Sequence, residues 1–432
     1  MLKKLQEALA RPGMKLALVF ALEGLLVQFG LSVKAFGNNL FATNLGATDT
    51  QIGLIQTIGC GVTIAFLLPS GILSDRCRSS KTMTVVLLAL GGLMFLLQAL
   101  VPWMGRARLV MFFVFVGLSS GMLGAYNGQW QAMFGDLVEM GQRNRVYALR
   151  SRVMAALGVI VPILCGVAMS NQNNSEAKMV ILSVFFCISG VLMFLQAFVV
   201  ARIPGGMRTP EQMAAMEKFT LKNLGEAVRT AVRNKPFLSF VLASMFLYMA
   251  WHVDWSIWYI AQVQYIGLTE AQLSYYNAIC CIAQIVAMSV LVRINQKRGS
   301  HFTVCIGACG LAMYPLYMQL ILRLPAGMRP WFFICLCTTA CMLECGVSLS
   351  MIQMMLDVVP EKHRSLTISL YTALTTLSNC IMPLLGVRAY TLLGADMRAL
   401  RIFFAGVLVW RSVAAALYLA RYRRIQKQKV TD

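Results

Sequence analysis

The segment that decides the fold of this chain is GILSDRCRSSK, residues 71–81. It places three basic residues and one acidic residue between two long apolar runs, 51–73 and 82–103. A helix needs about 20 mainly apolar residues to cross a bilayer, and both runs are long enough. A short charged turn between two such runs predicts a hairpin of membrane helices with its turn in water.

The same pattern of apolar runs and short polar turns extends over the whole chain. Of its 432 residues, 58% are hydrophobic and 13% are charged, against about 25% charged in a soluble domain. Irregular backbone does not face lipid, so each run should be a helix. We therefore predict an all-α membrane protein with twelve transmembrane helices, at 15–37, 51–73, 82–103, 109–133, 148–170, 178–200, 237–262, 271–293, 301–323, 331–356, 367–388 and 400–420.

The distribution of positive charge predicts the orientation. With the N-terminus assigned to the cytoplasm, 28 of the 38 Lys and Arg residues fall on the cytoplasmic side, 8 on the other side and 2 inside spans. Cytoplasmic loops of membrane proteins are enriched in these residues. We expect a multi-pass protein of the cell membrane with both termini in the cytoplasm. The net charge of +21 alone could suggest a nucleic-acid partner, but the basic residues lie mainly in alternate loops between apolar runs, which indicates membrane orientation and no nucleic-acid partner.

The longest polar stretch divides the chain near its middle. It predicts a cytoplasmic linker, 202–236, between an N-terminal six-helix bundle, 1–201, and a C-terminal one, 237–432. Within the linker, Thr209-Pro210-Glu211-Gln212 is typical of a helix start. Leu221, Leu224, Val228 and Val232 then form an apolar stripe, which predicts an amphipathic helix on the membrane surface.

An internal repeat relates the two bundles. When the chain is shifted by 221 residues, GATDTQ at 46–51 falls on GLTEAQ at 267–272. The same shift places Asp136 on Asp357 and Arg143 on Arg364. Agreement at separate places with one offset and equivalent topology indicates parallel halves, which is a known transporter architecture.

The turn at 71–81 resembles the loop signature of the major facilitator superfamily. Gly71, Asp75 and Arg76 match that signature, whereas Arg78 stands where it has a second glycine. In the second half Gln296 replaces the Asp, and Lys297 and Gly299 keep the basic residue and the glycine. The resemblance implies two six-helix bundles around a central cavity and alternating access, and it leaves the substrate open.

Charged residues near the turns are candidates for a cytoplasmic gate. A carboxylate at such a turn can pair with an Arg or a helix N-terminus in one conformation and lose that partner in another. A glycine there permits close approach of a neighbouring helix. The alternative is that these residues only fix topology and solvate the turns. The candidate gate residues are Gly71, Asp75, Arg76, Asp136, Arg143, Asp357 and Arg364.

Polar and aromatic side chains gather on the helices that line the cavity in the resembled fold. Aromatic faces with a few polar tips suit sugars, aromatic solutes or organic cations. In the seventh span, Tyr248, His252, Trp255 and Tyr259 recur at helical spacing and form one stripe. An aromatic belt at the membrane interface is the alternative. The candidate cavity residues are Asn127, Trp130, Tyr248, Trp251, His252, Trp255 and Gln353.

Three carboxylates within spans are candidates for ion coupling: Glu23, Asp254 and Glu344. Ionisable groups inside a membrane are costly and usually face the protein interior or a wet cavity. Each could instead be a structural partner of an Arg on another helix. Glu23 shares a helical face with Lys34, roughly 16 Å away at 1.5 Å per residue.

These features predict a secondary active transporter that moves a small organic solute across the cytoplasmic membrane by alternating access, coupled to protons. Multidrug-type efflux and sodium-coupled or uncoupled uptake of a sugar or other metabolite stay open, as does a transport-inactive sensor. No catalytic cluster and no Walker-type loop is evident, so we expect no enzyme. The spacing of the 13 cysteines fits no metal site, so we expect free thiols and no metal. We also expect no cofactor, contact with membrane lipid, and a monomer.

Overall fold

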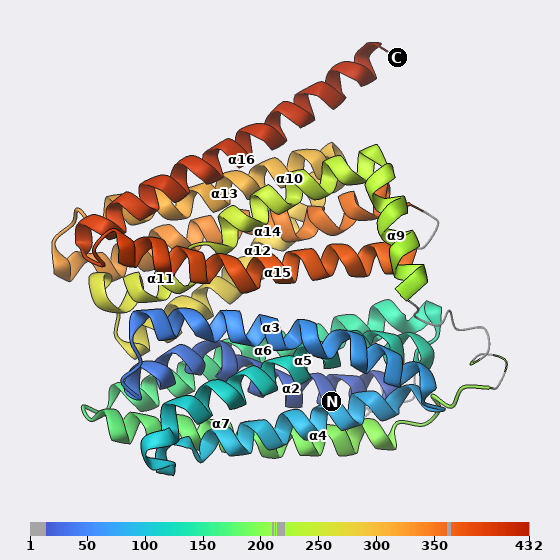
Figure 1. Cartoon of the computed structure of the whole chain (residues 1–432), viewed down its shortest axis with the longest axis horizontal. Helices are drawn as coiled ribbons and strands as arrows, with labels where there is room; N and C mark the ends of the chain where they lie inside the picture. The colour runs from blue at the N-terminus through green and yellow to red at the C-terminus, as the bar shows by residue number, and fades with distance from the viewer. Residues whose placement is uncertain (1–13, 210, 212, 214–220, 361–363, 432) are drawn as a thin grey trace, which may run out of the picture. The chain divides into compact units, whose positions relative to one another are not determined.

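The chain forms long helices in its computed structural model, which describes residues 14–209, 211, 213, 221–360 and 364–431 (Figure 1). Within these residues, twelve helical segments are long and apolar enough to cross a membrane, as predicted. The described residues group into two compact units. The first takes those up to Thr48 and from Ile58 to Lys218, and the second takes those from Asp49 to Thr57 and from Phe219 onward.

The first unit contains six long helices. Ser79, within the stretch 71–81, caps α4, because its side chain accepts a hydrogen bond from Lys81 N. Pro69 and Pro162 lie inside their helices without ending them. The helices are α2 (Met14–Asn44), α3 (Asp49–Arg76), α4 (Ser80–Ala99), α5 (Arg108–Leu137), α6 (Met140–Ser170) and α7 (Ser175–Arg202).

The second unit also has six spans, and its first span is interrupted. That span consists of α10 (Lys235–His252), α11 (Trp255–Ile260) and a π-helical turn, η3 (Ala261–Ile266), which ends at left-handed Gly267. The remaining helices are α12 (Glu270–Arg298), α13 (Ser300–Ile321), α14 (Arg329–Val358), α15 (Arg364–Leu392) and α16 (Met397–Thr431).

The two units pair their helices in the same way. In the first unit α2 packs on α6 and α7, and α4 packs on α5 and α7. In the second, α10 packs on α15 and α16, and α13 packs on α14 and α16. These are the same pairs in span order, so the helix packing repeats as the 221-residue offset predicts.

Glycines bring the backbones of neighbouring helices close in both units. A Cβ on Gly190 of α7 would lie 2.8 Å from the Gly92 carbonyl oxygen of α4. A Cβ on Gly307 of α13 would lie 2.3 Å from Val347 N of α14. Small residues at such crossings allow the dense packing on which helix association in a membrane depends.

Part of the predicted linker helix is present as α9 (Leu221–Arg233). Val228 and Val232 on its apolar stripe are exposed, and Ala231 is buried. The helix start predicted at Thr209-Pro210 falls largely on positions outside the described residues, apart from a hydrogen bond from Met213 N to Thr209 O.

Candidate functional site

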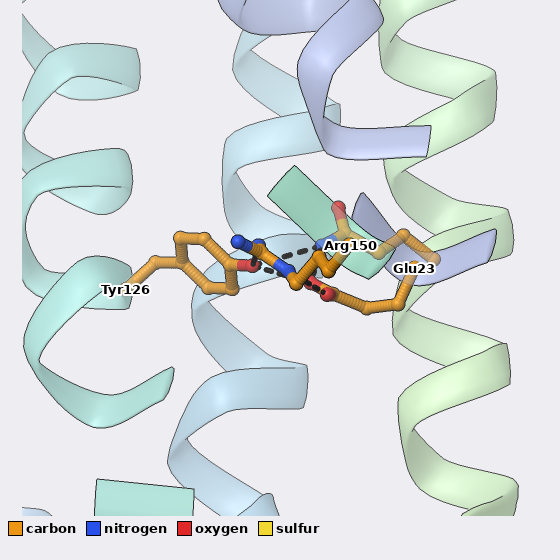
Figure 2. A network of polar contacts seen from close by, with 4 residues as sticks. Glu23, Tyr126 and Arg150 are labelled. Atoms are coloured by element: carbon orange, nitrogen blue, oxygen red, sulfur yellow. Dashed lines mark hydrogen bonds and ion pairs between the residues drawn. The ribbon is translucent and has the colours of Figure 1, made fainter. Parts of the chain in front are cut away.

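Glu23 lies at the centre of a buried polar network in the first unit (Figure 2). Arg150 Nε donates to Glu23 Oε2 at 2.8 Å. The Tyr126 hydroxyl and Gln196 Nε2 both donate to Glu23 Oε1, each at 2.5 Å. These four side chains come from α2, α6, α5 and α7, so one carboxylate joins four helices.

The Arg150 guanidinium completes this network with an aromatic contact. Its Cζ lies 4.0 Å from the centroid of the Trp130 ring, which is close enough for a cation–π interaction. The Arg150 stem runs past Gly24, where a Cβ would lie 2.5 Å from Arg150 Cγ. Trp130, a predicted cavity residue, is therefore buried under Arg150 inside the first unit.

A different arrangement holds Asp254 in the second unit. The span breaks at Val253 and Asp254, between α10 and α11. Arg411 of α16 reaches this break, and its Nη2 donates to Asp254 Oδ1 at 2.5 Å. The same guanidinium donates to the backbone oxygens of Ala250 at 2.9 Å, Trp251 at 3.1 Å and Leu311 at 3.0 Å. Arg411 thus satisfies carbonyl groups at the end of α10.

The break is also packed tightly against α15. A Cβ on Gly386 would lie only 1.8 Å from the Val253 carbonyl oxygen, so no larger residue fits there without movement of the backbone. His252, the last residue of α10, is buried, and its Nδ1 lies 3.1 Å from the Ser378 hydroxyl of α15. The broken span is therefore fixed by α15 and α16.

Glu344 of α14 has a different environment from the other two carboxylates. It hydrogen-bonds the Tyr314 hydroxyl of α13, and Arg411 and Asp254 are near enough to act on it electrostatically. Within the described residues Glu344 forms no ion pair of its own, because Arg411 is directed to Asp254 and the three carbonyl groups. The structure thus brings two of the predicted coupling candidates into one neighbourhood.

The aromatic residues of the seventh span form a stacked group before the break. The ring centroids of Tyr248 and Trp251 are 5.9 Å apart, and those of His252 and Trp255 are 4.8 Å apart. Trp255 is 38% exposed, whereas Tyr259 is buried. The interruption at Val253 and Asp254 means that the predicted stripe from Tyr248 to Tyr259 is carried by two helices, α10 and α11.

The other two predicted cavity residues lie elsewhere. Asn127 is exposed on α5, one residue after the buried Tyr126. Gln353 is exposed on α14, and its Oε1 accepts from Asn295 Nδ2 of α12 at 2.6 Å. No group of three or more His, Cys, Asp or Glu side chains suited to a metal ion occurs in the described parts of the chain.

Different partners from those expected hold the turn at 71–81. Arg208 donates to Ser74 O at 3.0 Å and lies 3.5 Å from Asp136, while Arg143 donates to the Gly135 and Val138 carbonyls. Arg208 is thus the cation beside Asp136, and Arg143 bonds to carbonyls at the end of α5, so the described residues show no ion pair between Asp136 and Arg143.

The remaining gate candidates show few contacts. A Cβ on Gly71 would meet no described atom within 4 Å, so the expected close approach of a neighbouring helix is absent there. Arg76 and Asp357 are exposed. The side chains of Asp75 and Arg364 lie outside what the structure describes.

A family model of the Major Facilitator Superfamily matches residues 20–383. The chain belongs to the major facilitator superfamily. This major facilitator protein is a membrane transporter, and its six-plus-six helix pattern agrees with the resemblance at 71–81. No curated protein matches the sequence.

Solved structures share the fold of this major facilitator protein at low sequence identity. A mutant of the nucleoside transporter NupG superposes with a TM-score of 0.70 at 12% identity, over 93% of this chain and 98% of that one. A bacterial homologue of the human lysosomal transporter Spinster has a TM-score of 0.68 at 14% identity, over 97% and 98%. A peptide transporter POT mutant with sulfate has a TM-score of 0.69 at 14% identity, over 95% of each chain.

Several residues of these networks were not among the sequence candidates: Tyr126, Arg150, Gln196, Tyr314 and Arg411. Arg150 was counted with the turn before the fifth span, because it lies near the start of that apolar run. Arg411 stood out as a basic residue within a span. A charge inside an apolar run implies a partner on another helix, and that signal pointed to Arg411 without naming Asp254.

Proposed function

We propose that this chain is a secondary active transporter that moves a small organic solute by alternating access, coupled to protons through Glu344. The observation that carries this proposal is the pairing of the three intramembrane carboxylates. Glu23 and Asp254 each have an Arg partner. Glu344 has the neutral Tyr314 hydroxyl.

The pairing decides which carboxylate can change its charge. Protonating Glu23 would leave Arg150 buried without a counter-charge, and protonating Asp254 would do the same to Arg411. An uncompensated buried charge costs about 3–5 kcal/mol. Protonating Glu344 instead makes the group of Glu344, Asp254 and Arg411 neutral, whereas its ionised form leaves one net negative charge. Glu344 can therefore gain and lose a proton at the least cost.

The aromatic group before the break is the proposed face for the solute. Tyr248, Trp251 and Trp255 present ring surface with few polar atoms, and Trp255 is exposed. This face lies on the same span as Asp254, which is near Glu344. A solute against these rings would therefore lie close to the coupling group.

The charged turns are the proposed cytoplasmic gate. Arg208 joins the ends of α3 and α5, and Lys81 Nζ donates to the Ile203 carbonyl at the end of α7. Movement of these helix ends would require these contacts to break. Asp75 and Asp357 stay gate candidates, with both termini proposed to be cytoplasmic on the charge distribution.

The test begins with a substrate screen on the purified full-length protein. Thermal unfolding is recorded with sugars, nucleosides, amino acids, carboxylates and organic cations, at two pH values, with and without sodium. A ligand that binds the folded state raises its stability by mass action. Transport of a stabilising solute is then measured in proteoliposomes, where we expect a pH gradient to drive its accumulation.

Glu344→Gln is the decisive variant. We expect it to abolish gradient-driven accumulation while solute exchange across the membrane at equal pH is kept. Glu176→Gln, which removes an exposed carboxylate at the start of α7, is the control and should behave as the unmodified protein. Accumulation driven by sodium alone, or unchanged accumulation in Glu344→Gln, would exclude proton coupling at Glu344. Ligand binding without any flux would favour a sensor.

A further inference from the structure

Lys34 is a basic residue inside the first unit that neither polar network uses. It lies in the middle part of α2, partly buried, on the stripe that also carries the buried Glu23 and Phe41. Ten residues separate it from the end of α2 at Asn44, which is about 15 Å along a helix. The backbone of Lys34 is therefore far from the end of α2, and its side chain is partly buried.

No carboxylate of the described residues forms an ion pair with Lys34. Glu23, on the same stripe, is about 16 Å away along the helix and is fully engaged by Arg150, Tyr126 and Gln196. The neighbouring group that acts on Lys34 electrostatically is the Cys60 thiol of α3. A charge inside a membrane protein is costly, so an anion bound beside Lys34 would lower this cost.

A second donor lies one helical turn from Lys34. Asn38 is buried, and its Oδ1 accepts a hydrogen bond from Gln98 Nε2 at 3.0 Å. The carbonyl oxygen of Asn38 is used in this bond, and its amide nitrogen is the group that could donate to an anion. Residues four apart lie on the same side of a helix, so an anion could take hydrogen bonds from Lys34 Nζ and Asn38 Nδ2 together.

We infer that Lys34 and Asn38 form an anion-binding site for a carboxylate group of the transported solute. This inference rests on the proposed transport function and names the chemical class of its substrate. One ammonium and one amide match a singly charged carboxylate. Phosphate groups are usually held by several basic or backbone donors, which this part of α2 does not offer among the described residues.

The experiment measures ligand-induced thermal stabilisation of the purified full-length protein. The probes are acetate, benzoate, succinate and amino acids, with acetamide and benzamide as neutral partners, and inorganic phosphate, methyl phosphate and chloride as other anions. We expect stabilisation by at least one carboxylate and none by its amide. Lys34→Gln should weaken that binding about tenfold or more, as expected for loss of a charged hydrogen bond. Lys34→Arg should keep most of it.

Two further variants separate binding from folding. Lys15→Gln removes an exposed charge from the same helix and should bind as the unmodified protein does. Lys34→Met should unfold at an equal or higher temperature without ligand, because it removes an uncompensated charge. A lower unfolding temperature for Lys34→Met would mean that Lys34 has a structural partner, and it would overturn the inference.

Other outcomes also overturn it: stabilisation by phosphates or chloride without carboxylates, no stabilisation by any anion, or unchanged carboxylate binding in Lys34→Gln. Flux measurements in proteoliposomes distinguish a failure of the anion site from a failure of the proposed transport function. If a neutral or cationic solute is transported and Lys34→Gln has no effect, the site fails and the transporter stands. If carboxylates bind through Lys34 and nothing is transported, the site stands and transport fails.

Discussion

Both units bury a carboxylate against an arginine, but the partner at the centre differs. In the first unit Glu23 is the centre, and three side chains from three other helices donate to it. In the second unit Arg411 is the centre, and it donates to Asp254 and three backbone carbonyls. The first network joins four helices through side chains, whereas the second compensates for a break in one helix.

The repeat preserves the helix pairing but not this chemistry. At the 221-residue offset, Glu23 corresponds to Ser244 and Arg150 to Tyr371. In the other direction, Asp254 corresponds to Val33 and Arg411 to Gly190. Neither pair has a charged counterpart in the other half. The helix packing is therefore repeated between the halves, whereas the ionic networks are not.

The largest effect should come from removing one partner of the Glu23 network. Arg150→Met leaves Glu23 buried without a cation, and we expect a loss of about 3–5 kcal/mol in the free energy of unfolding. Thermal unfolding in detergent measures it. The double variant Glu23→Leu with Arg150→Met should recover most of the loss, because both charges are then gone. A double variant as unstable as the single one would show that packing, not charge, is responsible.

The next largest loss of stability should come from substituting the glycines that leave room for each network. Gly386→Ala would place a methyl group against the Val253 backbone oxygen, which only backbone movement can relieve, and we expect a cost of about 3 kcal/mol. Gly24→Ala meets the Arg150 side chain instead, and about 1–2 kcal/mol is expected. Gly71→Ala, with no described atom near its Cβ, is the control. A larger cost for Gly24→Ala would reverse this ranking.

Asp254→Asn should cost less than the loss of a Glu23 partner. Arg411 keeps its three carbonyl acceptors, and the Asn side chain can still accept from it, so we expect about 2 kcal/mol. Glu23→Gln, measured in the same unfolding experiment, should cost more because Arg150 loses its carboxylate. Equal costs for the two substitutions would mean that the carbonyls contribute nothing to holding Arg411.

The smallest effect should come from the ring under Arg150. Trp130→Phe keeps an aromatic face but weakens the cation–π contact, and we expect about 0.5–1 kcal/mol. Trp103→Phe, on an exposed 3₁₀ turn, is the control, with little change expected. If the cation–π contact stabilised the Glu23 network more than the Glu23–Arg150 ion pair does, Trp130→Phe would lower the free energy of unfolding nearly as much as Arg150→Met.

The twelve spans and the repeat followed from the sequence because both depend on local properties. An apolar run of sufficient length predicts a helix wherever it lies, and GILSDRCRSSK indicated the family. The partners of Glu23 and Asp254 did not follow, because they lie 127 and 157 residues away and no local pattern specifies them.

The break in the seventh span left no local signal either. The sequence around Val253 and Asp254 contains no proline or glycine, the residues that usually interrupt helices. The residues that permit the break are remote in sequence: Gly386 of α15 leaves room for it, and Arg411 of α16 donates hydrogen bonds to its carbonyl oxygens.

The position of Arg411 near the end of the chain has a consequence for the order in which the protein matures. Every member of the Glu23 network is present once Gln196 has been synthesised, so the first unit can complete its interior early. The Ala250 and Trp251 carbonyls at the break bond to Arg411, which is synthesised 161 and 160 residues later. At a synthesis rate of about 5–20 residues per second, this delay is roughly 10–30 s. If synthesis stopped before the last span, the first unit would have its complete Glu23 network, whereas the second unit would lack Arg411 at the break in its first span.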